Sequence, residues 1–185
     1  MKVFNNYIVL LFFIFLAGCA SVPKQVSPEK YQEFEKLVLN KNYTITSNWA
    51  YPMASNSLNQ LQNTGLFPIG SNASTIDVSG TSNYFTIKND SIFADLPYFG
   101  ERQMGGNYNS SDIGINIESP LENVISEKDK NGNYIIKLSA KDSKNHTESY
   151  RITARLFQNN TTSIFINSSH RTPIQFRGMI SKISE

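Results

Sequence analysis

Residues 146–157 read His-Thr-Glu-Ser-Tyr-Arg-Ile-Thr-Ala-Arg-Leu-Phe, and from Tyr150 onward apolar and polar side chains alternate strictly. A period of two residues is typical of a β-strand that buries one face and exposes the other. Comparable runs lie on either side, at 133–140 and 161–166, and the connecting segments contain Asp, Ser and Asn. The three runs therefore predict consecutive antiparallel strands joined by tight turns.

Further short runs with strand character extend this pattern in both directions. They lie at 75–78, 83–88, 91–96, 113–118, 121–127 and 174–183, and a first strand begins at Asn42, with Tyr43, Ile45 and Trp49 on one face. Strands spaced by some 8–12 residues are typical of a large antiparallel sheet that curls to protect its edges. We expect an α+β, mostly β fold: one N-terminal helix packed on a curved sheet or partly closed barrel of about nine strands.

The helix is predicted to begin at Ser27-Pro28-Glu29, where a capping hydroxyl, a proline at the first helical position and an acid in the first turn coincide. Its apolar residues recur at spacings of three and four. They are Tyr31, Phe34, Leu37 and Val38. These side chains form one apolar stripe along the helix, and we expect this stripe to pack against a sheet.

The start of the chain has the pattern of an export signal. A lysine is followed by the apolar run 7–16 and then by Ala17-Gly18-Cys19. An apolar run of about ten residues is too short to span a bilayer and fits a secretory signal. Leu16 to Cys19 resembles a bacterial lipobox, so we expect residues 1–18 to be a lipoprotein signal peptide and Cys19, the only cysteine, to carry acyl chains. Residues 19–27 then form a lipidated tether, and 28–185 a single mostly-β domain.

The residues after Cys19 bear on which membrane holds the protein. Ala20-Ser21 follow the cysteine without an aspartate, and no acid occurs up to Val26. By resemblance to other lipoproteins, this implies the outer membrane of a Gram-negative cell envelope, with the periplasmic face favoured over the cell surface.

Composition narrows the classes of function. The chain has 17 Lys and Arg against 15 Asp and Glu, so its net charge is only +2, and the basic residues are scattered. This disfavours a nucleic-acid partner, which a protein binds with clustered cations. One Cys and two His disfavour a metal or thiol site, and we expect no metal, no other cofactor and no catalytic residue.

The densest local feature is the segment Leu96-Pro97-Tyr98-Phe99-Gly100, followed by Arg102. Proline ends the preceding strand, and the two aromatic rings either pack onto the core or form a contact surface. Two long irregular segments, 52–73 and 100–112, could flank such a corner as the mouth of a barrel does. Candidate residues for binding a ligand or partner are therefore Tyr98, Phe99, Arg102 and Trp49.

This corner, the glycine-rich loop after it, Ile113-Gly114-Ile115 and the final segment from Arg171 to Ile180 resemble the DUF4251 family, uncharacterised bacterial lipoproteins that contain a domain of unknown function. The resemblance covers about 31–184. It implies an envelope location and an α+β or mostly β domain, and it supplies no activity.

The function that we expect is that of a non-enzymatic outer-membrane lipoprotein that binds an apolar small molecule or an envelope protein. One alternative is a hydrolase of envelope glycans or lipids, which would need two carboxylates in one cleft. Another alternative is a structural subunit of an envelope assembly, for which an exposed apolar patch would be the sign.

Overall fold

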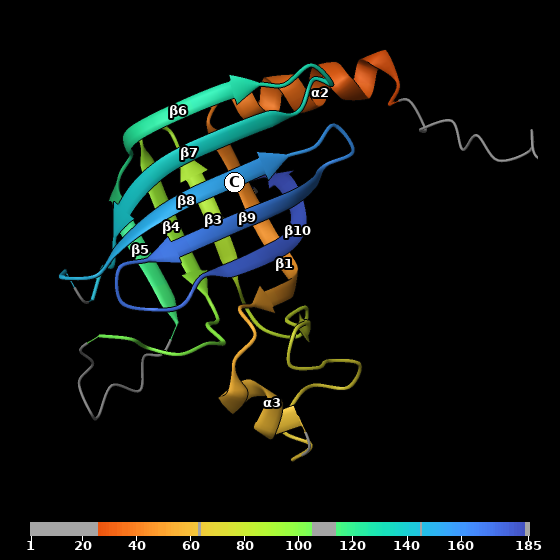
Figure 1. Ribbon diagram of the computed structural model, residues 1–185. Helices are drawn as coiled ribbons and strands as arrows, with labels where there is room; N and C mark the ends of the chain where they lie inside the picture. Colours follow the sequence, from red (N-terminus) through yellow and green to blue (C-terminus); the bar gives the residue numbers. More distant parts are fainter. Residues whose placement is uncertain (1–25, 63, 105–113, 145, 184–185) are drawn as a thin grey trace, which may run out of the picture.

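The computed structural model describes residues 26–62, 64–104, 114–144 and 146–183 (Figure 1). It confirms the mostly β fold: ten antiparallel strands form one sheet in the order β5-β4-β3-β1-β10-β9-β8-β7-β6, with β2 paired to β1. The helices are α2 (Pro28–Leu39) and α3 (Asn56–Gln62). The strands are β1 (Asn42–Pro52), β2 (Ile76–Asp77), β3 (Tyr84–Lys88), β4 (Ser91–Leu96), β5 (Ile115–Pro120), β6 (Glu122–Lys128), β7 (Tyr134–Lys141), β8 (Ser149–Leu156), β9 (Thr161–Ser168) and β10 (Ile174–Lys182).

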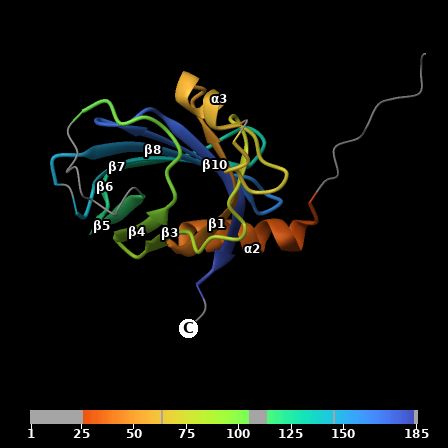
Figure 2. The same ribbon diagram turned by 90° about the horizontal axis from the view of Figure 1, so that it is seen from below.

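The sheet nearly closes because one stretch of chain supplies both of its edges. β5 pairs with β4, and β6 pairs with β7, although only Leu121 separates β5 from β6. The Ser143 amide also donates to the Asn116 carbonyl oxygen at 2.9 Å, which joins β5 to the β7–β8 turn. Figure 2 shows the two halves of the sheet facing each other around a common interior. This arrangement removes the open edges that would otherwise invite association with other strands.

The interior is filled by the inward-facing side chains. On β8 the alternation read from the sequence holds, because Tyr150, Ile152, Ala154 and Leu156 are all buried. The largest fully buried side chains come from both halves of the sheet. They include Tyr43, Ile45, Phe85, Ile92, Tyr150 and Phe176. Burial of this apolar surface is the main stabilising contribution to the fold.

Helix α2 covers one end of the sheet, as the sequence predicts. The Ser27 Oγ accepts from the Lys30 amide at 3.5 Å, and Phe34 and Val38 are buried. Glu35 Oε1 accepts from Lys128 Nζ at 2.7 Å and from the Tyr134 hydroxyl at 3.1 Å, and these contacts tie the helix to the β6–β7 hairpin. Neither α2 nor α3 is long and apolar enough to cross a membrane.

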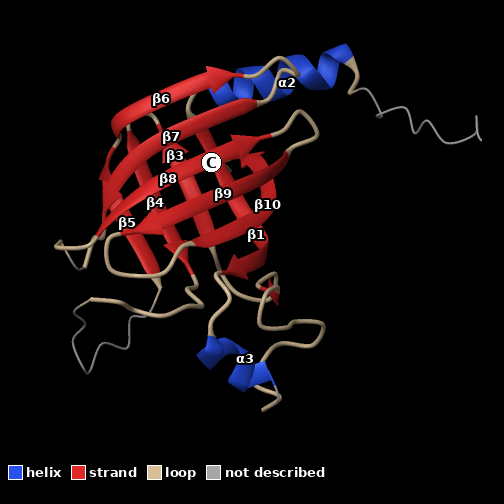
Figure 3. Ribbon diagram, in the orientation of Figure 1, coloured by secondary structure: helices blue, strands red, loops and turns tan. Residues whose placement is uncertain are grey.

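The segment between β1 and β2 lies at the opposite end, where it contains the seven-residue helix α3 (Figure 3). Leu58 is the buried residue of this helix, and the Ser57 hydroxyl donates to Glu101 Oε1 at 2.8 Å. The irregular segment and the corner near Gly100 therefore meet at the same end of the sheet, as expected.

The strand face predicted for Trp49 is wrong. Tyr43 and Ile45 face the interior, but the pairing of β1 with β10 shifts between Ser47 and Trp49, with Ser47 opposite Gly178 and Trp49 opposite Arg177. An extra residue in one strand reverses the alternation beyond it. Because of this bulge, Ala50 returns to the interior, and Trp49 lies on the outer face.

Candidate functional site

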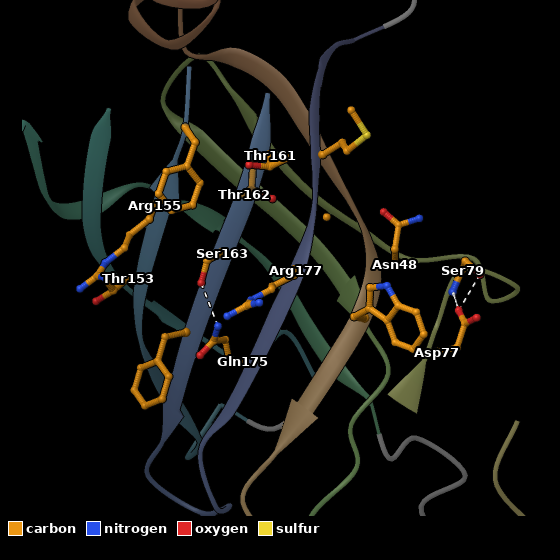
Figure 4. Close-up of a pocket in the computed structure, with 15 residues that line it drawn as sticks. Asn48, Asp77, Ser79, Thr153, Arg155, Thr161, Thr162, Ser163, Gln175 and Arg177 are labelled. Carbon is orange, nitrogen blue, oxygen red and sulfur yellow. Dashed lines mark hydrogen bonds between the residues drawn. The ribbon is translucent and has the colours of Figure 1, made fainter. Parts of the chain in front are cut away.

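A groove of about 1080 Å³ crosses the outer face of β8, β9, β10 and β1 (Figure 4). We call it the outer groove. Its lining residues are Asn48, Trp49, Asp77, Ser79, Thr153, Arg155, Phe157, Thr161, Thr162, Ser163, Phe165, Gln175, Arg177, Gly178 and Met179. Its volume is at the upper end of the range for small-molecule sites, and the groove is open, which suits an extended ligand.

The strand register places the central residues of the outer groove in one row across the sheet. Arg155 on β8 pairs with Ser163 on β9, Ser163 with Arg177 on β10, and Arg177 with Trp49 on β1. Trp49 in turn pairs with Asp77 on β2. Residues that are directly opposite on neighbouring strands project from the same face. The row therefore holds two guanidinium groups with a serine between them and an indole at one side.

Two further rows flank this central row. On one side, Thr161 pairs with Met179. Phe157 lies next to them, because its backbone amide donates a hydrogen bond to the Thr161 carbonyl oxygen. On the other side, Phe165 pairs with both Thr153 and Gln175. Phe165 and Met179 are large apolar side chains that remain exposed. The outer groove thus has a cationic centre between two partly apolar borders.

Several side chains in and beside the outer groove are held in place. The Arg177 guanidinium lies 5.0 Å from the centroid of the Tyr51 ring, a cation–π distance, and Gln175 Nε2 donates to Ser163 Oγ at 3.1 Å. The carboxylate of Asp77 accepts from the hydroxyl and the amide of Ser79, and these hydrogen bonds lower the pKa of Asp77. Among the described residues, neither Arg155 nor Arg177 forms an ion pair.

The lining of the outer groove contains few side chains that could transfer a proton. Asp77 is the single carboxylate among the lining residues, and no histidine lines the groove. General acid–base catalysis needs a titratable group placed beside the reacting atoms. The outer groove also offers cations, hydroxyls, amides and aromatic rings, which can contact a polar or charged ligand.

The other predicted binding residues lie elsewhere, and none of them lines the outer groove. The hydroxyl of Tyr98 donates to the Thr172 carbonyl oxygen at 2.9 Å, its ring lies 5.1 Å from the Arg171 guanidinium, and burial raises its pKa. Phe99 is partly buried against the core. Arg102 Nη1 lies 3.6 Å from Glu148 Oε2. Tyr98 and Arg102 thus contact a buried charge cluster, and the predicted flanking residues 105–112 lie outside the described part of the chain.

That cluster is built around Glu148 and Arg171. The Arg171 Nε and Nη2 atoms lie 2.8 and 3.1 Å from the two carboxylate oxygens of Glu148, and Nη1 donates to the Gly114 carbonyl oxygen at 2.7 Å. Glu148 also accepts from the Ser168 hydroxyl at 2.6 Å. Buried charges need such complete pairing. The cluster therefore joins the turns at this end of the sheet.

A smaller cleft of about 370 Å³ bears on the hydrolase alternative. Glu118, Glu122, Asp142 and His146 are among its lining residues. The Asp142 carboxylate is buried and accepts from the Tyr150 hydroxyl at 2.6 Å, which raises the pKa of Tyr150 after the larger effect of burial. Glu118 and Glu122 are exposed. In the part of the chain that the structure describes, no group of three His, Cys, Asp or Glu residues could hold a metal ion.

Sequence reasoning missed Arg155, Arg177 and Phe165 as members of a site. The alternation along β8 already places Arg155 on the outer face, but only the register between strands brings it into line with Arg177. The available signal was the presence of Arg and Phe at outward positions of neighbouring strands, where short polar residues are the usual choice.

The fold and the outer groove define a class of protein: a small, helix-capped antiparallel β domain that carries a polar and aromatic groove on its outer face. The chain belongs to the DUF4251 family, a domain of unknown function whose sequence profile matches residues 25–180. A crystal structure of a DUF4251 family protein from Bacteroides eggerthii DSM 20697 is similar, with a TM-score of 0.55 and 13% identity over 83% of this chain and 88% of that one. Among curated proteins, none matches.

Proposed function

We propose that this protein is a non-enzymatic binding protein of the cell envelope, held at the outer membrane by acyl chains on Cys19, and that the outer groove is its binding surface. The observation that carries the proposal is the central row of the outer groove, where the side chains of Arg155 and Arg177 flank Ser163 and Trp49 adjoins them. Exposed Arg side chains beside a half-buried Trp are typical of binding sites.

The membrane anchor is supported by the sequence alone. Cys19 follows a short apolar run and the small residues Ala17 and Gly18, as in a lipobox. Residues 1–25 lie outside the described part of the structure. Two or three acyl chains bind a membrane far more stably than one chain does.

The position of the outer groove favours an envelope component over an apolar small molecule. Aromatic and branched side chains such as Phe85, Ile92 and Phe176 fill the interior of the sheet. In the outer groove, an apolar ligand would cover two guanidinium groups without compensating them, which is unfavourable. A polar or charged partner would instead replace their lost hydration.

Site-specific photo-crosslinking in living cells tests this proposal. A photoreactive amino acid is placed at Phe165, which is 44% exposed in the outer groove, and in a matched control at Tyr84 on β3, which is 42% exposed and does not line it. We expect an adduct of defined size from position 165 and none from position 84.

The result that would contradict the proposal is equal crosslinking from both positions, or none from either. A protein adduct and a glycan adduct would both support it, because each would show that the outer groove is occupied by an envelope component.

A further inference from the structure

The two arginines of the outer groove constrain the chemistry of its ligand. Arg155 and Arg177 lie on β8 and β10 with β9 between them, so their backbone positions are two strand spacings apart, or roughly 10 Å. Both side chains are exposed, and the Tyr51 ring supports Arg177. A ligand whose negative charges are spaced on the order of this separation could contact both guanidinium groups.

The residues between and around the arginines indicate what lies between those charges. Short hydroxyl and amide side chains form most of the floor: Thr153, Thr161, Ser163, Gln175 and Asn48. Trp49, Phe157 and Phe165 contribute aromatic surfaces beside them. Sugars match this combination, because a sugar ring has hydroxyls around its edge and an apolar C–H face that packs on an aromatic ring.

Other anionic partners match less well. Serine and threonine are under-represented among the residues that dominate protein–protein interfaces, which disfavours an acidic protein on a floor made largely of these residues. A nucleic acid carries a phosphate at every nucleotide, a denser charge than two cations at this separation neutralise. A chain of sugars with a carboxylate on alternate units spaces its charges by about one disaccharide.

We infer that the outer groove binds an acidic glycan chain, with Arg155 and Arg177 each contacting one carboxylate and Trp49 packing against a sugar ring between the two borders. This inference rests on the proposed function and names the chemical class of its ligand. Arginine is well suited to the role, because its planar group forms two parallel hydrogen bonds to a carboxylate.

The test uses the full-length lipoprotein in a nonionic detergent. Trp49 is the only tryptophan of the chain, so its fluorescence reports on the outer groove directly. The probes are hyaluronan and unsulfated chondroitin, which carry a carboxylate on alternate sugars, each in its free-acid and its methyl-esterified form, together with poly-glutamate, and calorimetry provides a second measurement. We expect at least one free-acid glycan to bind saturably, and its methyl ester to bind at least about tenfold more weakly.

Matched variants localise the binding. Arg155→Gln and Arg177→Gln should each weaken it by about tenfold, whereas Arg151→Gln, on the same strand as Arg155 but outside the groove lining, should change it by less than about twofold.

Three results would overturn the inference: no binding of any free-acid glycan, equal binding of the methyl esters, or poly-glutamate binding as tightly as the glycans. Each of these would leave a crosslink from Phe165 as independent support for the proposed function. Loss of that crosslink would contradict the proposed function itself.

Discussion

Glu148 and Arg171 form a two-point ion pair in which the side chain of Glu148 is fully buried and that of Arg171 is 3% exposed. The two residues precede β8 and β10 respectively, so one contact joins two of the turns at the end of the sheet opposite α2. Because Arg171 also packs against Tyr98, the corner that the sequence singled out depends on this pair.

Removing the charge of Glu148 should therefore destabilise the domain strongly. We expect Glu148→Gln to lower the free energy of unfolding by about 3 kcal/mol or more, because it leaves a buried guanidinium without its counter-ion. The control is Glu127→Gln, which removes an exposed pair with Lys137 and should cost less than about 1 kcal/mol. Urea denaturation of both variants checks this, and equal losses would contradict it.

Gly178 should be intolerant of any side chain. It faces Ser47 across β1 and β10, and an added Cβ would overlap the Thr46 carbonyl oxygen and lie 2.7 Å from the Ser47 Cα atom. We expect Gly178→Ala to reduce stability by about 2 kcal/mol or more, since backbone atoms must shift. In Gly80→Ala the new Cβ meets no atom within 4 Å, and the change should stay within about 0.5 kcal/mol. Thermal denaturation compares the two, and similar melting temperatures would be the contrary result.

The β6–β7 turn should contribute to acid sensitivity. The Asp129 carboxylate accepts from the side chain and amide of Asn133 and from the Asn131 amide, and these bonds lower its pKa. A pKa lower in the folded than in the unfolded chain gives a stabilisation that is complete above the unfolded value of about 3.9 and is lost as the pH falls through the folded value. In Asp129→Asn, the loss of stability below about pH 4 should be shallower than in wild type. Denaturation as a function of pH measures this, and identical slopes would argue against it.

Anchoring should depend on Cys19. We expect Cys19→Ala to abolish incorporation of an alkyne-labelled palmitate and to remove the protein from the outer-membrane fraction, because acyl burial contributes about 0.8 kcal/mol per methylene. Ser21→Ala, which leaves the cysteine and the residues before it intact, should behave as wild type. Labelling of the Cys19→Ala variant at wild-type level would refute the lipobox interpretation.

The strands could be predicted because the pattern that marks each strand lies within its own short stretch of sequence. Alternation along β8 fixes which face each residue occupies, and the Ser27-Pro28-Glu29 cap fixes where α2 begins. The near closure of the sheet could also be predicted. A sheet of many short strands tends to curl, because curling protects its edge strands.

The site was less predictable because it depends on register. The bulge after Ser47 has no clear mark in the sequence, yet it moves Trp49 from the expected inner face to the outer groove. Likewise, Arg155 and Arg177 can be placed in the same row only when it is known that β8, β9 and β10 are neighbours in the sheet. Tyr98 and Arg102 stand out in the sequence, but their partners Arg171 and Glu148 lie far along the chain, so these contacts could not be predicted from it.

Occupancy of the outer groove in the cell is measured most directly by cysteine protection. Met179→Cys and Ile125→Cys introduce thiols at two positions that are both 53% exposed, and only the first lines the outer groove. A membrane-permeant maleimide is applied to intact cells and to the purified protein. A bound envelope component should slow labelling at position 179 in cells relative to the purified protein, while labelling at 125 stays the same. Equal labelling of position 179 in cells and in the purified protein would contradict the claim that the outer groove is a binding surface.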